Sequence, residues 1–301
     1  MSLPDTVTAL GAQLDAGGAI TPAPDLFAAH DVFAAELPQI FVRPWMAVDH
    51  ASRLAEDGRW FRCDAANRSV AIVRESAEQI HALRNVCLHA GYRICEEDEG
   101  RSERLLCIYH GWEYALDGRL TDPLLRPELT DRSRYRLARY GLRVSHGLIL
   151  LDLSAPGPAP QPAPFDDGTV PADLAELAVI RRHRFATSWN WKYVRQLLRS
   201  SPQLFLPAGD GAMIEYGPLS LLMRGAGQTV LLRINPKFPG QTDFEAIWLA
   251  PAGTPEPAGV EERVGEALRQ TGDAISAAPL AWLGRDFYDW YWPLMAPVAA
   301  A

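Results

Sequence analysis

The chain has 301 residues, 48% of them hydrophobic, with a formal net charge of −8 and a pI of about 5.4. This composition is typical of a soluble globular protein, and the acidic balance argues against a general affinity for nucleic acid or for an anionic membrane. No apolar run reaches the roughly 18 residues of a membrane-spanning helix, and the N-terminus lacks the basic start and apolar centre of a secretory signal. We therefore expect a cytoplasmic protein.

The first part of the chain, residues 1–41, is predicted to be a helical arm that packs on the C-terminal domain. Apolar residues recur at roughly helical spacing in DLFAAHDVFAAELPQIFV (25–42), just before Pro44.

A series of short strand-like segments follows, separated by turn residues. Several of them alternate between apolar and polar residues, as half-buried strands do. The segments read WMAVDH, RWFRCDA, RSVAIVRE, QIHALRNV, RLLCIYH and GLRVSHGLILLDL. They predict a compact antiparallel β domain over residues 42–154.

A proline-rich segment, APGPAPQPAP (155–164), is the best linker candidate because five prolines in ten residues keep it extended. Beyond it, residues 165–301 mix helical and strand patterns. Helices are expected around 188–199 and 260–270, strands near 211–236 and 244–250, and an aromatic tail at 287–292. The chain as a whole is predicted to be an α+β protein.

Two cysteines and two histidines in the β domain have the spacing of a metal site. The pattern is Cys87-x-His89, seventeen intervening residues, and then Cys107-x-x-His110. Zinc fingers pair each ligand type with itself, whereas each segment here offers one thiolate and one imidazole. That arrangement favours a Rieske [2Fe–2S] cluster, in which two histidines hold one iron and two cysteines the other. Zinc, or buried cysteines and surface histidines without a metal, are the alternatives.

The segment NVCLHAGYRIC…LLCIYHGWEYALDGRL resembles the Rieske domain of the α subunits of Rieske non-haem iron oxygenases. The second loop of that family typically reads CPYHGW-x-Y-x-x-DG, and the stretch IFVRPWMAVDHASRL resembles the segment that opens the domain. The resemblance implies that Cys87 and Cys107 hold the inner iron, and that His89 and His110 hold the iron nearer the surface. A ferredoxin or a flavin reductase would be the electron donor.

The two remaining cysteines, Cys63 and Cys95, are expected to be buried free thiols. A second cysteine in the first loop is found in respiratory Rieske proteins, where it forms a disulfide with an extra cysteine in the second loop. The corresponding position here is Ile108, so that disulfide is unavailable.

The same family binds a mononuclear iron in a helix-grip C-terminal domain, through two histidines and a carboxylate. This chain keeps the start of that motif, Asn190-Trp191-Lys192, but no histidine follows His183. The expected ligand and bridging positions hold Gln196, Ser200, Ser201, Gln203 and Ala208. We therefore expect a degenerate catalytic-type domain with no mononuclear iron and an inactive site of its own.

Basic residues are concentrated in three places. Lys192, Arg195 and Arg199 fall on one face of the predicted helix, and other groups occupy residues 132–143 and 181–184. Each group is interpreted as a solvated face or as a docking surface for an acidic donor or partner chain. The tail FYDWYW is interpreted as core or as an inter-subunit anchor.

Family members form rings of three α subunits, in which the Rieske cluster of one chain supplies the mononuclear iron of its neighbour. The leading hypothesis is therefore a non-catalytic, Rieske-bearing subunit in a mixed trimer or hexamer with a catalytic Rieske oxygenase subunit. An alternative is a stand-alone electron carrier or ligand-binding protein with a dead oxygenase pocket. A third is a self-sufficient oxygenase with an unrecognised iron site.

Overall fold

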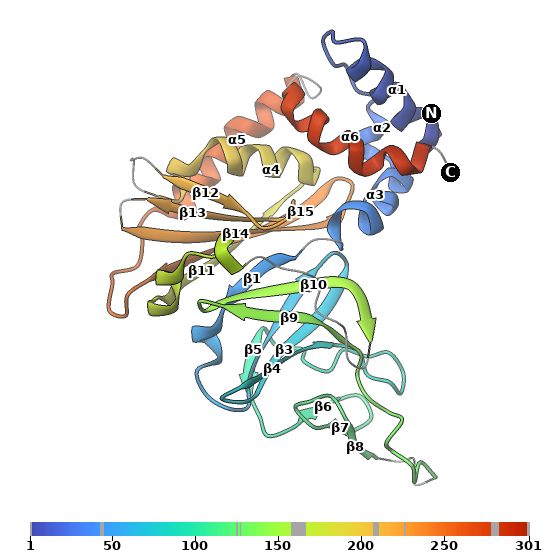
Figure 1. Ribbon diagram of the computed structural model, residues 1–301, viewed down its shortest axis with the longest axis vertical. Helices are drawn as coiled ribbons and strands as arrows, with labels where there is room; N and C mark the ends of the chain where they lie inside the picture. The colour runs from blue at the N-terminus through green and yellow to red at the C-terminus, as the bar shows by residue number, and fades with distance from the viewer. Residues whose placement is uncertain are drawn as a thin grey trace. The chain divides into compact units, whose positions relative to one another are not determined.

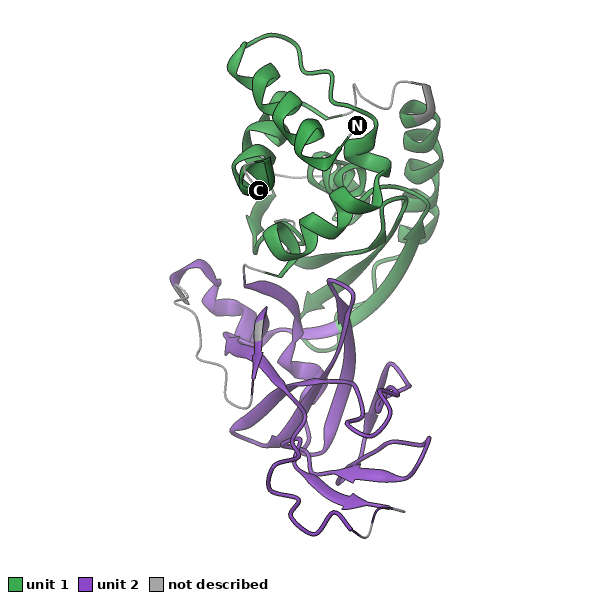
Figure 2. Cartoon of the chain, turned by 90° about the vertical axis from the view of Figure 1, so that its right-hand side faces the viewer, with its two compact units in different colours: residues 1–44, 180–301 green, residues 45–179 purple. Residues whose placement is uncertain are grey.

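The structure is a computed structural model that describes residues 2–42, 45–124, 126, 128–157, 167–206, 211–225, 227–277 and 283–299. Its contacts divide the chain into two compact units (Figure 2). Unit 1 combines residues 1–44 with 180–301, and unit 2 is residues 45–179. Most of the segment predicted as a linker, residues 158–164, lies outside the described residues, and the division between the units falls at 179/180. No described helix is long and apolar enough to cross a membrane.

Unit 2 is built on an antiparallel sheet whose described strands run in the order β1-β10-β9-β4-β3-β2-β5 (Figure 1). The strands are β1 (Met46–His50), β2 (Arg59–Ala65), β3 (Arg68–Ser76), β4 (Gln79–Arg84), β5 (Glu99–Arg101), β9 (Arg139–Ser145) and β10 (Leu148–Gly157). Ala66-Asn67 and His146-Gly147 join neighbouring strands with positive φ at both turn residues. Such primed turns match the twist of the strands they connect, so they fix the register of both hairpins.

A smaller sheet in unit 2 consists of β6 (Leu105–Leu106), β7 (Trp112–Tyr114) and β8 (Leu120–Pro123). The segment RLLCIYH, predicted as one strand, is a strand only at β6, and Cys107–His110 form a loop between β6 and β7. Buried side chains from both sheets share one core, which includes Val73, Leu83 and Tyr114. This core fixes the base of the loop.

Unit 1 contains a five-stranded antiparallel sheet in the order β11-β15-β14-β13-β12, with α4, α5 and α6 on one side of it (Figure 1). The strands are β11 (Ala178–Thr187), β12 (Ala212–Glu215), β13 (Ser220–Gly225), β14 (Gln228–Phe238) and β15 (Gln241–Ala250). The helices are α4 (Trp191–Ser200), α5 (Val260–Ala277) and α6 (Arg285–Ala299). The mixed α+β architecture expected from the sequence is confirmed.

The N-terminal arm belongs to unit 1 and is helical. It comprises α1 (Leu3–Asp15), α2 (Asp25–Ala28), α3 (His30–Glu36) and a π-helical turn, η1 (Leu37–Phe41). Helix α1 packs along α6, where a Cβ on Gly11 would lie 2.5 Å from the ring of Trp292. The aromatic tail lies in α6, whose Phe287 and Tyr291 are buried in the core of the unit.

Two charged side chains of α4 are buried in the same core. Lys192 is fully buried and lies 2.5 Å from Glu36 of the arm, which also accepts hydrogen bonds from Trp191 Nε1 and Tyr291 Oη. Arg195 is 1% exposed and bonds Glu215 at 2.7 Å. Both interpretations of this basic face, solvated or partner-docking, are therefore wrong for Lys192 and Arg195, because their charges are paired inside the unit.

The other basic groups also have internal carboxylate partners. Arg136 and Arg139 contact Asp117, while Arg182 and Arg184 contact Glu245. Burial alone would raise the pKa of Glu245, but three arginines, with Arg233 the strongest, outweigh it and hold that pKa at about 2.

Candidate metal centre

The two cysteine–histidine segments form loops with the same backbone hydrogen-bond pattern. Cys87 N–H donates to the carbonyl of Tyr92 and its carbonyl accepts from Gly91, at 2.7 and 3.0 Å. Cys107 repeats both bonds, donating to Trp112 and accepting from Gly111, each at 2.9 Å. Both glycines have positive φ, 74° and 70°, which a side chain rarely tolerates. The sequence thus builds two similar turns that each present one cysteine and one histidine.

The imidazoles of His89 and His110 converge. Their Nδ1 atoms are 3.1 Å apart, and both rings are partly exposed. Two nitrogens bound to one ion at about 2.1 Å lie about 3.0–3.4 Å from each other. The two nitrogens are therefore already placed as a pair of ligands for one metal ion.

The thiols of Cys87 and Cys107 lie deeper, at 3% and 1% exposure. Burial, together with the neighbouring thiol of Cys87, raises the pKa of Cys107. Burial and the contact with Cys87 also raise the pKa of Tyr114, whose hydroxyl lies 3.2 Å from Cys87 Sγ. Two buried sulfurs behind two outer nitrogens fit a binuclear iron–sulfur group and its two ligand types. Among the described residues, no group of three or more His, Cys, Asp or Glu side chains is placed so that it could hold a metal ion.

One buried donor beside the imidazoles has no partner among the described residues. Trp112 is 2% exposed, its ring stacks on His89 with centroids 4.9 Å apart, and its Nε1 is unpaired. Buried N–H groups are rarely left unpaired, so this donor also fits a site built to hold an additional acceptor group.

Neighbouring side chains hold the loops in place. Asn85 is buried, accepts from the backbone N–H of Ile94 and Cys95, and donates to the Cys95 carbonyl, closing the first loop at its base. Beyond the second loop, Asp117 accepts hydrogen bonds from the backbone and side chain of Arg119. Its pKa is lowered, because these bonds and Arg136 outweigh the opposing effect of burial. Sequence reasoning missed Asn85, since nothing local to NVC indicates that this side chain turns inward.

The other two cysteines are placed as expected. Cys63 and Cys95 are buried and form no disulfide, and burial raises the pKa of Cys95 to about 12. All four cysteines lie within the described residues.

Exposed apolar side chains gather on the two loops and the strands beside them. Of the eight large hydrophobic residues that are exposed in the described chain, six lie on or next to these loops. They are Leu88, Tyr92, Leu106, Ile108, Tyr109 and Leu124, with Ile108 the most exposed at 68%. Exposed apolar side chains concentrated in one part of the chain are typical of protein–protein contact sites. We call these six residues the loop rim.

The expected positions of a second metal site lie in and after α4. Gln196 is half-buried, Ser200 Oγ bonds the Gln196 carbonyl at 2.6 Å, and Gln203 is exposed in the short helix η5 (Pro202–Leu204). Ser201 is the C-cap residue that follows α4, and Ala208 lies outside the described residues. The chain then returns to the core at Phe205, whose carbonyl accepts from Trp248 Nε1 at 3.2 Å.

Comparison with known proteins identifies a Rieske domain in this chain. The profile of the Rieske [2Fe–2S] domain matches residues 44–131. The chain is 31% identical over 170 residues to the glycine betaine monooxygenase oxygenase subunit of Chromohalobacter salexigens, which is 54% of this chain and 37% of that protein. It is 32% identical over 99 residues to the biphenyl dioxygenase subunit alpha of Metapseudomonas furukawaii. That match covers 33% of this chain and 22% of that protein. The matched region thus spans less than two fifths of these relatives.

Solved structures share the fold over more of the chain. The quaternary ammonium Rieske monooxygenase CntA, in complex with L-carnitine, superposes with a TM-score of 0.63 at 16% identity, covering 87% of this chain and 85% of that one. Naphthalene 1,2-dioxygenase from Rhodococcus sp. gives a TM-score of 0.63 at 16% identity. That superposition covers 94% of this chain and 87% of that one. The fold of both units is therefore that of a Rieske oxygenase α subunit.

Proposed function

We propose that this chain, a homologue of the Rieske oxygenase α subunits, is a Rieske-bearing subunit that supplies electrons to a catalytic oxygenase subunit and performs no oxygenation itself. The observation that carries the proposal is an intact pair of Cys/His loops in a chain with no histidine after His183. A facial triad needs two imidazoles, and residues 184–301 contain none.

The proposed ligands are Cys87 and Cys107 for the inner iron and His89 and His110 for the outer one. A bound Rieske cluster would supply one-electron chemistry at a potential above that of plant-type ferredoxins, because neutral imidazoles replace two thiolates. The protein's part is to keep both thiols away from water while leaving the imidazole edges exposed. The buried cysteines and the converging Nδ1 atoms of two partly exposed histidines support this division.

The proposed partner surface is the loop rim around His89 and His110. An electron has to leave the chain at the imidazole edge, so a partner must approach there closely. Exposed Ile108 and Tyr109, directly before His110, offer an apolar contact that excludes water when covered. A catalytic oxygenase subunit in a mixed ring and a ferredoxin or flavin reductase are the two partners this surface would have to serve.

Iron analysis tests the cofactor part of the proposal. We expect two irons and two acid-labile sulfides per chain, with the electron paramagnetic resonance spectrum of a Rieske cluster after reduction. Cys87→Ala and His110→Ala should lose this signal. Cys95→Ala removes another buried thiol of the first loop and His146→Asn another exposed histidine, so both control variants should keep it. A mononuclear iron that remains in Cys87→Ala after anaerobic loading would contradict the proposal.

Co-expression with a catalytic subunit tests the proposed electron-transfer role. The chain is co-expressed with a catalytic α subunit from its own genome whose own Rieske cysteines are replaced by alanine. Glycine betaine and carnitine are the first substrates to try, since the relatives are named for acting on such compounds. Turnover that requires the wild-type chain, and is absent with its Cys87→Ala variant, supports the proposal. Turnover by the chain alone would refute it.

A further inference from the structure

His89 and His110 lack the hydrogen bond that usually orients a metal-binding imidazole. Such a ring typically donates its second N–H to a carboxylate, a backbone carbonyl or a water, and this bond fixes the plane of the ring. Among the residues that the structure describes, the Nε2 atom of neither histidine has a hydrogen-bond partner, and the rings meet only each other through Nδ1. The second torsion of a histidine side chain is broad, so another contact has to set the planes of these rings.

Trp112 provides that contact for His89. The indole lies almost parallel to the imidazole, with 11° between the planes and 4.9 Å between the centroids. Trp112 is 2% exposed and belongs to the core that the two sheets of unit 2 share, so its own ring is held by packing. Its carbonyl also accepts from the Cys107 N–H at 2.9 Å. One residue therefore closes the second loop with its backbone and supports the histidine of the first loop with its ring.

His110 has no equivalent support. The ring beside it, apart from that of His89, belongs to Tyr109, which is tilted by 48° and is 59% exposed. Exposed side chains change rotamer within nanoseconds, so Tyr109 cannot fix a neighbouring plane as a buried indole does. The two imidazoles thus differ, since the core orients His89 and does not orient His110.

We propose that Trp112 is a positioning residue whose buried ring fixes the plane of His89, in place of the hydrogen bond that usually does so. An imidazole nitrogen directs its lone pair within the plane of the ring, so this plane decides where His89 Nδ1 can hold an ion. The proposal rests on the Rieske cluster proposed above. Trp112 acts through His89 alone, and groups that orient a ligand in this way typically contribute 10- to 100-fold to metal affinity.

Two substitutions of Trp112 isolate the effect of the ring. Trp112→Phe keeps a flat aromatic side chain, whereas Trp112→Leu keeps an apolar side chain without a ring. Both variants lack the Nε1 donor, so a difference between them reports the stacking and not that N–H.

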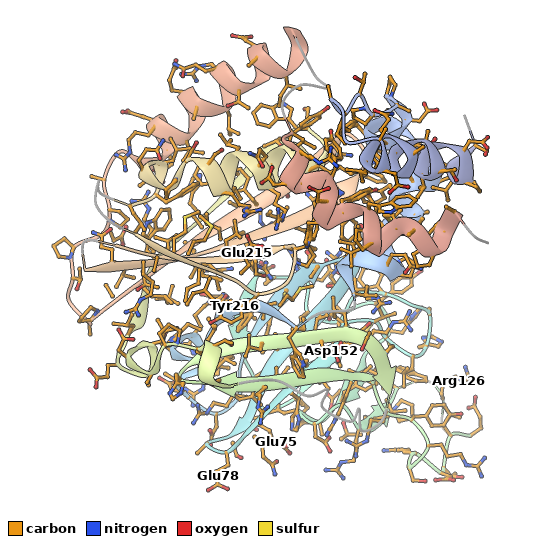
Figure 3. The ribbon with its side chains drawn as sticks, turned by 45° about the horizontal axis from the view of Figure 1, so that its top comes forward. Glu75, Glu78, Arg126, Asp152, Glu215 and Tyr216 are labelled. Carbon is orange, nitrogen blue, oxygen red and sulfur yellow. The ribbon has the colours of Figure 1, made fainter. Side chains whose placement is uncertain are left out.

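Two control variants lie in the same unit. Trp60→Leu removes another indole that packs against the same core, and none of the described ring contacts of the two histidines involves Trp60. Glu78→Gln changes an exposed side chain that projects outward at the turn between β3 and β4 (Figure 3).

The first measurement is the rate at which the full, cluster-loaded chain loses iron to a chelator without oxygen. Trp112→Leu should lose iron about 10-fold faster than the wild type, and Trp112→Phe should recover most of that difference. Trp60→Leu and Glu78→Gln should lose iron at the wild-type rate, even if Trp60→Leu melts at a lower temperature. Equal rates for Trp112→Leu and the wild type, or the same acceleration in Trp60→Leu, would overturn the inference.

Pulsed electron paramagnetic resonance of the reduced chain gives a readout that a role in folding alone would not move. It resolves the couplings of the two histidine nitrogens to the cluster. In Trp112→Leu the coupling of one nitrogen should change and that of the other should stay, while Trp112→Phe and Trp60→Leu keep both. Two unchanged couplings in Trp112→Leu would contradict the proposed role.

Nuclear magnetic resonance of the iron-free chain separates this inference from the proposed function. The ring current of the indole should shift the imidazole C–H signals of His89 upfield, as assigned with His89→Asn. Trp112→Leu should abolish the shift and Trp60→Leu should keep it. An unshifted His89 in the wild type would overturn the inference even if a cluster binds. A shifted His89 in a chain that takes up no cluster would support the fixed ring plane and contradict the proposed function.

Discussion

The buried ion pair between Lys192 and Glu36 is predicted to contribute strongly to the attachment of the N-terminal arm to the rest of unit 1. Both side chains are 0% exposed, and their charged atoms lie 2.5 Å apart. Lys192 Nζ also donates to the carbonyl of Leu26 in α2, at 2.8 Å. The change that tests this attachment is Lys192→Met, which keeps the length of the side chain and removes its charge.

The expected magnitude follows from what Lys192→Met leaves behind. Glu36 would keep its hydrogen bonds from Trp191 and Tyr291 but would lose Lys192, the one cation that pairs with it among the described residues. Removing one partner of a buried pair typically costs about 3–5 kcal/mol, because the other charge is left uncompensated. For a unit of this size, each kcal/mol lowers the melting temperature by about 2–4 °C. Lys192→Met should therefore melt about 6–20 °C below the wild type.

The assay is thermal unfolding followed by circular dichroism, with limited proteolysis of the arm. The double variant Glu36→Gln/Lys192→Met removes both charges and keeps an amide whose oxygen can accept from Trp191 Nε1 and whose NH2 can donate to the Tyr291 hydroxyl. It should recover most of the loss, since replacing both members of a buried pair is often close to neutral. Glu266→Gln, in the exposed pair with Arg269, is the control and should leave the melting temperature unchanged.

The reasoning would be refuted if Lys192→Met melted within about 2 °C of the wild type, less than 1 kcal/mol by the same conversion. It would also fail if the double variant, with the glutamine oxygen facing Trp191 and its NH2 facing the Tyr291 hydroxyl, were as unstable as the single one. In that case packing of the lysine chain, rather than its charge, would hold the arm.

Three further predictions concern other sites. Tyr114→Phe removes the hydroxyl beside Cys87 Sγ and should lower the reduction potential of the bound cluster by about 40 mV, which corresponds to about 1 kcal/mol; protein-film voltammetry measures it. Gly111→Ala places a Cβ 2.6 Å from Leu124 at a φ of 70°, so iron content per chain should fall. Glu245→Gln should destabilise the protein at pH 7, since a pKa of about 2 against the ordinary glutamate value of 4.5 corresponds to about 3 kcal/mol. Because the pKa of Glu245 is lower in the folded protein, this stability is complete above pH 4.5 and is lost as the pH falls toward 2. The free energies of unfolding from denaturant titrations at pH 7 and pH 3 should therefore differ less for the variant than for the wild type.

Local patterns predicted most of the strands in unit 2. Burial alternates along β2 at Phe61, Cys63 and Ala65, as the sequence indicates, and His146-Gly147 marks the turn of the β9–β10 hairpin. The sequence also indicated the proposed ligand residues, because their spacing is itself a local signal. The Rieske domain that this spacing predicts is confirmed by the family match.

Features that depend on residues distant in the chain could not be predicted from the sequence. Helix α1 has Val7, Leu10 and Leu14 at helical spacing, but its partner α6 lies at the other end of the chain. The charges of Lys192 and Arg195 indicate a solvent-facing stripe unless Glu36 and Glu215 are known to lie opposite. Side-chain pairing of this kind is fixed by the fold, not by neighbours in sequence.

The motif Asn190-Trp191-Lys192 is explained by these distant contacts without reference to a second iron. Asn190 donates to the carbonyls of Phe27 and Pro239, Trp191 donates to Glu36, and Lys192 pairs with Glu36. Each of the three residues thus joins α4 to the arm, and Asn190 also joins it to the connection between β14 and β15. In a chain without the iron ligands these contacts would still stabilise unit 1. If Lys192→Met loosens the arm but leaves the cluster spectrum unchanged, then the motif identifies the fold of unit 1 and is no sign of catalytic iron.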